Sequence, residues 1–139
     1  MADFKQRVEV EFDNIQKILA RLPQSKELPN LSPLELAGVA AFIHSFYNGL
    51  ENILKQAVLE KGNLLPQGET WHRDLVILAD KSGIISKDVQ QELKQYLAFR
   101  HFFSHAYAFE LDSQRLVDLV EGIRSLFDSF QKDIEGFQW

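Results

Sequence analysis

The chain has 139 residues, 45% hydrophobic and 25% charged, which is the balance of an ordinary globular protein with a buried core. Its net charge of -5 argues against broad electrostatic binding of nucleic acid, which normally needs a basic face, although a small local basic site stays open. The absence of cysteine excludes disulfides and thiolate metal sites, and the lack of a long apolar run or a secretory signal predicts a cytoplasmic protein with no membrane partner.

Apolar residues recur at helical spacing along almost the whole chain, and no run shows convincing strand-like alternation. The first helix is expected over residues 4–22, where a proline closes it, and a loop over residues 23–30 follows. Ser32 and Glu35 form a capping signal for a long second helix that runs to about Lys61.

The second half of the chain contains three further helical patterns. Thr70 is expected to cap a short helix over residues 71–80, and Gly83 suits the left-handed turn that ends it. Ser86 can cap the next helix, and the last helix is expected to begin near Asp112. The fold class is therefore all-α.

Four or five helices with short connections predict an antiparallel bundle that forms a single domain over residues 1–139. The second and last helices carry a surplus of apolar residues, and the chain ends in "GFQW". This surplus predicts a homodimer that buries hydrophobic surface between subunits. The alternative is that the same residues pack inside one bundle.

The fourth helix carries a stripe at spacings of three and four in which Arg100 occupies a slot for an apolar side chain. A buried guanidinium needs a carboxylate, a cleft or a bound anion, because it cannot lose its proton. Glu51 and Asp74 are candidate partners, and Arg100 could instead extend to the surface. The stripe comprises Val89, Leu93, Tyr96, Arg100, Phe103 and Tyr107.

His101 and His105 lie four residues apart, a spacing that two-histidine metal sites use. The glutamate that a zinc protease would hold between them is missing, so a zinc hydrolase is not expected. His44 and His72 could add ligands in principle, but isolated histidines in helical proteins are more often structural. We therefore expect no metal and no other cofactor.

Arg100 and His105 together suit metal-free RNA cleavage. A base removes the proton of the ribose 2′-hydroxyl, the oxygen attacks phosphorus, and a cation stabilises the charge of the transition state. On a straight helix the two side chains point about 140° apart, so they do not converge on one phosphate. Either the helix distorts near His105, or two copies of the motif meet across a symmetric interface.

The segment "RHFFSH", from Arg100 to His105, resembles the signature of the HEPN superfamily. Its continuation to Tyr107 is similar to the HepT toxins of HepT/MntA systems, as are "YNGLENILK" in the second helix and "WHRDLV" in the third. Most HepT motifs begin Arg-Asn, whereas this chain has Arg-His. His101 could take the place of that asparagine or assist catalysis.

The resemblance implies a helical bundle that dimerises, with Arg100 and His105 catalysing metal-independent RNA cleavage. It also implies an MntA-like nucleotidyltransferase antitoxin that transfers AMP to Tyr107, and an RNA substrate, tRNA being one candidate. Glu51 would orient Arg100, and Ser104 would be a supporting residue of the site. One alternative is a catalytically silent HEPN module that binds nucleotide or RNA, and another is a helical dimer that acts as an interaction scaffold. For Tyr107, the alternative is a structural role at an interface.

Overall fold

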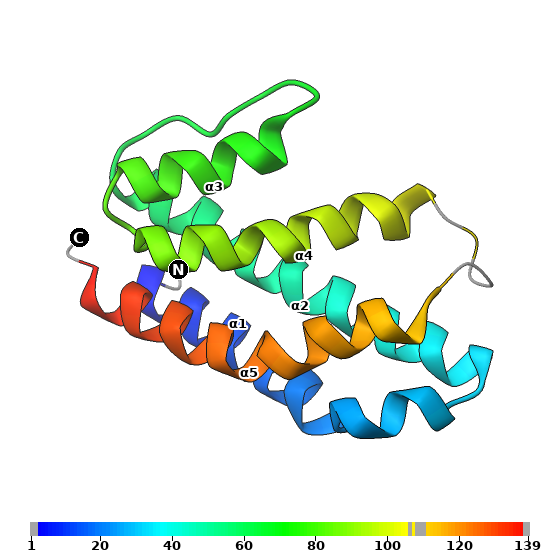
Figure 1. Ribbon diagram of the computed structural model, residues 1–139. Helices are drawn as coiled ribbons and strands as arrows, with labels where there is room; N and C mark the ends of the chain where they lie inside the picture. Colours follow the sequence, from blue (N-terminus) through cyan, green and yellow to red (C-terminus); the bar gives the residue numbers. More distant parts are fainter. Residues whose placement is uncertain (1–2, 106, 108–110, 138–139) are drawn as a thin grey trace.

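The computed structural model describes residues 3–105, 107 and 111–137 (Figure 1). These ranges contain helices and no strand, which confirms the all-α fold class. In chain order the elements are α1 (Phe4–Arg21), the 3-10 helix η1 (Ser25–Asn30), α2 (Pro33–Glu60), α3 (Trp71–Lys81), α4 (Lys87–His105) and α5 (Ser113–Gly136).

The long helix α2 is the axis of the bundle, because it contacts α1, α3, α4 and α5. The short helix α3 packs against both α2 and α4, and α4 in turn packs against α5 (Figure 1). Three helices therefore meet where α2, α3 and α4 adjoin. No described helix is both long and apolar enough to cross a bilayer.

Side-chain caps explain where most of the helices begin. Ser32 Oγ accepts from the Glu35 N–H at 3.1 Å, and Glu35 Oε1 accepts from the Ser32 N–H at 3.0 Å, so the predicted capping box at the start of α2 is confirmed. The Ser86 hydroxyl accepts from the Val89 N–H, and the Asp112 carboxylate from the Gln114 N–H, as expected for caps of α4 and α5.

Two local predictions were wrong. The segment predicted as a loop over residues 23–30 contains η1, which packs against α5 and buries Leu28 completely. Thr70 precedes α3 but does not cap it, because its hydroxyl donates to Asp74 Oδ2 at 2.9 Å instead of accepting from a backbone N–H. Gly83 does adopt the predicted left-handed conformation, with φ of +78°.

The apolar stripe of α5 lies inside the bundle, where its eight large side chains are buried together with those of α2. The surplus that predicted a dimer is thus used within one chain, and the dimer stays a prediction. Of the "GFQW" segment, Phe137 is buried and Gln138 and Trp139 lie outside the described residues. Large apolar side chains that are exposed among the described residues are Val10, Leu34, Leu59, Leu64 and Tyr107.

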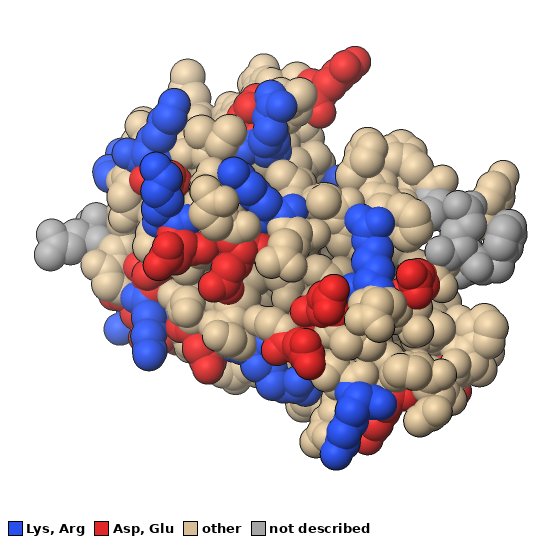
Figure 2. All heavy atoms as spheres, viewed as in Figure 1, with Lys and Arg blue, Asp and Glu red and all other residues tan. Residues whose placement is uncertain are grey.

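Acidic and basic side chains are interspersed over the face that Figure 2 shows, with acidic groups over α5 and α4. This face therefore offers no continuous basic stripe of the kind that tracks a nucleic-acid backbone.

Candidate functional site

One face of α2 places His44, Tyr47 and Glu51 in line, at spacings of three and four residues. This face is covered, since Tyr47 is 1% exposed and Glu51 only 3%. Charged groups are seldom buried to that extent without a partner. The buried carboxylate of Glu51 therefore marks this part of the bundle as the candidate functional site.

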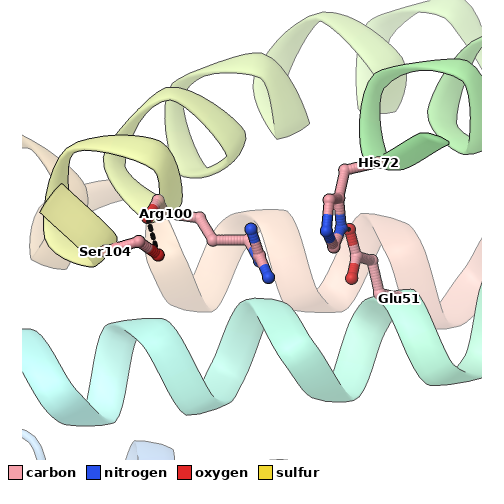
Figure 3. Close-up of polar contacts among 4 residues, drawn as sticks. All are labelled: Glu51, His72, Arg100 and Ser104. Carbon is pink, nitrogen blue, oxygen red and sulfur yellow. Dashed lines mark hydrogen bonds and ion pairs between the residues drawn. The ribbon is translucent and has the colours of Figure 1, made fainter. Parts of the chain in front are cut away.

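The partner of Glu51 is His72, in the first turn of α3. Its Nδ1 lies 2.6 Å from Glu51 Oε2, and 19% of its side chain is exposed (Figure 3). The Trp71 ring stacks beside the imidazole, with 3.6 Å between the ring centroids. A carboxylate and a neighbouring ring thus fix the orientation of His72.

Arg100 projects from α4 toward the His72–Glu51 pair (Figure 3). Its Nε is buried and has no hydrogen-bond partner, and within the described ranges its guanidinium forms no ion pair. Asp74, one of the two candidate partners, does not pair with Arg100, because its carboxylate accepts from Thr70 and lies near Arg73. Glu51 also differs from its predicted role, since its hydrogen bond goes to His72 and not to the arginine.

Arg100 and Glu51 impose opposite fields on the residues between them. Burial lowers the pKa of His44, the positive charge of Arg100 lowers it further, and Glu51 opposes both. Burial raises the pKa of Tyr47 far above its ordinary value, and the negative charge of Glu51 adds to the rise. The Tyr47 hydroxyl is therefore a neutral polar group beside the Glu51 carboxylate.

The second half of the motif faces the other way. His101 and His105 are exposed, with ring centroids 4.7 Å apart, and His105 is the last residue of α4. Ser104 Oγ donates to the Arg100 carbonyl oxygen at 2.9 Å, so its hydroxyl bonds within the helix. One chain thus holds Arg100 inward and His105 outward, and it does not bring them together.

Tyr107 lies beyond the end of α4 and is 69% exposed. The prediction that it continues the buried stripe of the fourth helix was therefore wrong. Phe103, one turn after Arg100, does pack inward, with its ring centroid 5.0 Å from that of His44.

Sequence reasoning missed His44, Tyr47 and His72 as members of this cluster. The spacing of His44, Tyr47 and Glu51 on one helical face was a usable signal, because it places three polar groups in an apolar pattern. No such signal existed for His72, which meets Glu51 only through the packing of α3 on α2.

The hollows of the surface lie elsewhere. One hollow, of about 640 Å³, lies between α1 and α5 and involves none of these residues. A second, about 370 Å³, is lined by Lys55, Leu65, Trp71 and Leu75 and adjoins His72 through Trp71. In the part of the chain that the structure describes, no group of three or more histidines and carboxylates could hold a metal ion.

A family model described as HepT-like protein matches residues 38–139. The match covers α2 to α5 and includes every residue of the cluster and of the motif. No curated protein and no solved structure matches the chain.

Proposed function

This chain belongs to the HepT-like family of the HEPN superfamily, and from that premise we propose that it is a metal-independent endoribonuclease toxin. The HepT-like family is in general a family of HEPN-type ribonucleases. The observation that supports the proposal is Arg100, whose guanidinium has a buried Nε and no acidic partner in the described ranges. Such a group binds an anion well, and the phosphodiester of RNA is an anion.

In the proposed reaction a histidine removes the proton of a ribose 2′-hydroxyl, and the oxygen attacks the adjacent phosphorus. The bond from phosphorus to the 5′-oxygen breaks, and the leaving oxygen takes up a proton. Arg100 stabilises the charge that builds on the phosphoryl oxygens. The products are a 2′,3′-cyclic phosphate and a 5′-hydroxyl, and no metal or cofactor takes part.

His105 is the motif histidine, and its exposed position at the end of α4 supports a site shared between two copies. In a homodimer, His105 of one copy can approach a phosphate that Arg100 of the other binds. The geometry of a single chain favours this arrangement over a site within one subunit, because Arg100 is partly buried whereas His105 is exposed at the end of α4. His101, beside His105, would then line the same interface.

The experiment is to incubate purified protein with total RNA in EDTA, beside the Arg100→Ala and His105→Ala variants. Cleavage by the wild type and its loss in both variants is the expected result. Arg73→Ala is the matched control, because Arg73 is an exposed arginine on α3. Binding of RNA without cleavage would favour the alternative of a silent HEPN binding module.

The partner in this proposal is an MntA-like nucleotidyltransferase that transfers AMP to Tyr107 in the cytoplasm. The exposure of Tyr107, at 69%, supports it as the acceptor. After co-expression with such an enzyme, the intact mass should rise by one or more AMP units, and Tyr107→Phe should abolish the rise. Retention of the added mass in Tyr107→Phe would reject this residue as the acceptor.

A further inference from the structure

The bond between Glu51 and His72 fixes which nitrogen of the imidazole carries a proton. We assign a proton to His72 Nδ1, because an ionised carboxylate only accepts hydrogen bonds and Glu51 Oε2 lies 2.6 Å away. Nε2 is then the nitrogen free to accept or release a proton. A carboxylate that holds a histidine in this way also stabilises the imidazolium that forms when the ring takes up a proton.

The environment of the pair suits proton transfer better than a purely structural role. The buried carboxylate belongs to α2 and the partly exposed imidazole to α3, so solvent or a substrate can reach the ring but not Glu51. Stacking on Trp71 keeps the ring in place. Lys55 lies over the indole at 4.4 Å, and it adds a positive charge near this edge of the bundle.

Arg100 connects the pair to the proposed reaction. Figure 3 shows its guanidinium and the His72–Glu51 pair directed toward one another from α4 and from α3 and α2. His44 and Tyr47 on α2 experience the charges of both Arg100 and Glu51, so the groups lie in one electrostatic neighbourhood. A phosphodiester held by Arg100 would therefore lie on the same side of the bundle as His72.

We propose that His72, positioned by Glu51, is the general base of the ribonuclease site, and that His105 serves as the acid. The proposal rests on the proposed function. Nε2 of His72 takes the proton of the 2′-hydroxyl, the 2′-oxygen bonds to phosphorus, and the bond to the 5′-oxygen breaks. His105 protonates that leaving oxygen, and exchange with water returns both histidines to their starting states.

The test compares His72→Asn with the wild type on a defined RNA oligonucleotide. Asparagine keeps an N–H donor near the Nδ1 position, so it can still satisfy the buried Glu51 carboxylate, but it has no nitrogen at the Nε2 position. We expect kcat to fall by about 10²- to 10⁴-fold, the usual contribution of general base catalysis, with KM little changed because Arg100 is intact. The acidic limb of the pH–rate profile should disappear.

Glu51→Gln supplies a readout that a structural role would not move. The amide oxygen still accepts from Nδ1, but the negative charge that favours the imidazolium is gone. The acidic limb of the profile should therefore shift to lower pH. Asp74 lies in the same turn of α3 as His72, and its carboxylate accepts from Thr70. Asp74→Asn should leave both kcat and the acidic limb of the pH–rate profile unchanged.

Each outcome decides between the two proposals. If the wild type cleaves RNA and His72→Asn cleaves with the same kcat and pH profile, His72 is not the base and the proposed function stands. If the wild type cleaves no RNA, the proposed function fails and the role of His72 fails with it. Thermal unfolding of each variant identifies a folding defect, and a variant with a lowered Tm is assayed at a temperature at which it is folded.

Discussion

Replacing Arg100 by methionine should stabilise the protein while it abolishes function. Methionine keeps an unbranched, flexible stem of similar length, so it retains most of the packing of the arginine side chain between α4 and its neighbours. It removes a guanidinium whose Nε is buried without a hydrogen bond and whose charge has no partner in the described part of the chain. The substitution therefore removes a buried donor that has no acceptor.

The size of the gain follows from the buried donor. A buried polar group without a hydrogen bond costs about 1–3 kcal/mol, and part of this is recovered because Arg100 is only partly buried. We expect the free energy of unfolding to rise by about 1–2 kcal/mol, which for a chain of this size raises Tm by roughly 3–8 °C.

Arg124 provides the contrasting arginine, because it is exposed and its hydrogen bonds are satisfied. Its Nη2 donates to the carbonyl oxygen of Leu19 at 2.8 Å and approaches that of Leu22 at 3.4 Å, which ties α5 to the end of α1. Arg124→Met leaves these carbonyls without their donor and should lower the free energy of unfolding by about 1–3 kcal/mol. The same substitution should thus have opposite signs at the two positions.

The assay is thermal unfolding by circular dichroism in a buffer without phosphate, repeated with added inorganic phosphate. Phosphate should raise the Tm of the wild type, since an anion that binds only the folded state stabilises it, and should leave Arg100→Met unaffected. A fall in Tm for Arg100→Met as large as that for Arg124→Met would refute the reasoning, because it would mean that Arg100 already has stabilising contacts inside the bundle.

Three further predictions concern local structure and pH. Ser32→Ala should lower the free energy of unfolding by about 1 kcal/mol in urea titrations, because it removes the cap of α2. Gly83→Ala should cost about 1–2 kcal/mol at φ of +78°, whereas Gly136→Ala, where an added Cβ meets nothing within 4 Å, should not destabilise. Because the folded state lowers the pKa of His44, the unfolded chain binds more protons, so stability should fall as the pH drops below about 6.5. NMR titration of His44 should show its pKa rising toward the ordinary value in Arg100→Met, since the Arg100 charge that lowers it is gone.

The helices of this fold could be predicted because their signals are local. Apolar spacing and side-chain caps lie within a few residues of each other, and they placed the starts of α2, α4 and α5 correctly. The 3-10 helix η1 was missed because six residues are too few to show a period, and its one buried side chain, Leu28, is held by contact with the distant α5.

The candidate site was predictable only in part, for a related reason. Arg100 stood out because a charge in an apolar stripe is visible in the sequence alone. The partner of Glu51 was not visible, because 21 residues and a change of helix separate it from His72. The buried position predicted for Tyr107 was wrong, because helical spacing alone does not show where a helix ends. No capping residue marked the end of α4 at His105.

Arg100 and His72 lie within the bundle, whereas His105 and Tyr107 are exposed at the end of α4, and this difference bears on how the proposed toxin would be inhibited. Under the proposal, a chain that holds Arg100 and a carboxylate-bound His72 would need only an acid from its partner copy, and the exposed end of α4 would supply His105 as that acid. Tyr107 follows the same exposed end of α4 and is itself exposed. AMP attached to it would add bulk and negative charge at the surface that RNA and the partner copy must approach. Inhibition would then act on assembly and access of the shared site, and it would leave the Glu51–His72 bond intact for reactivation once the AMP is removed.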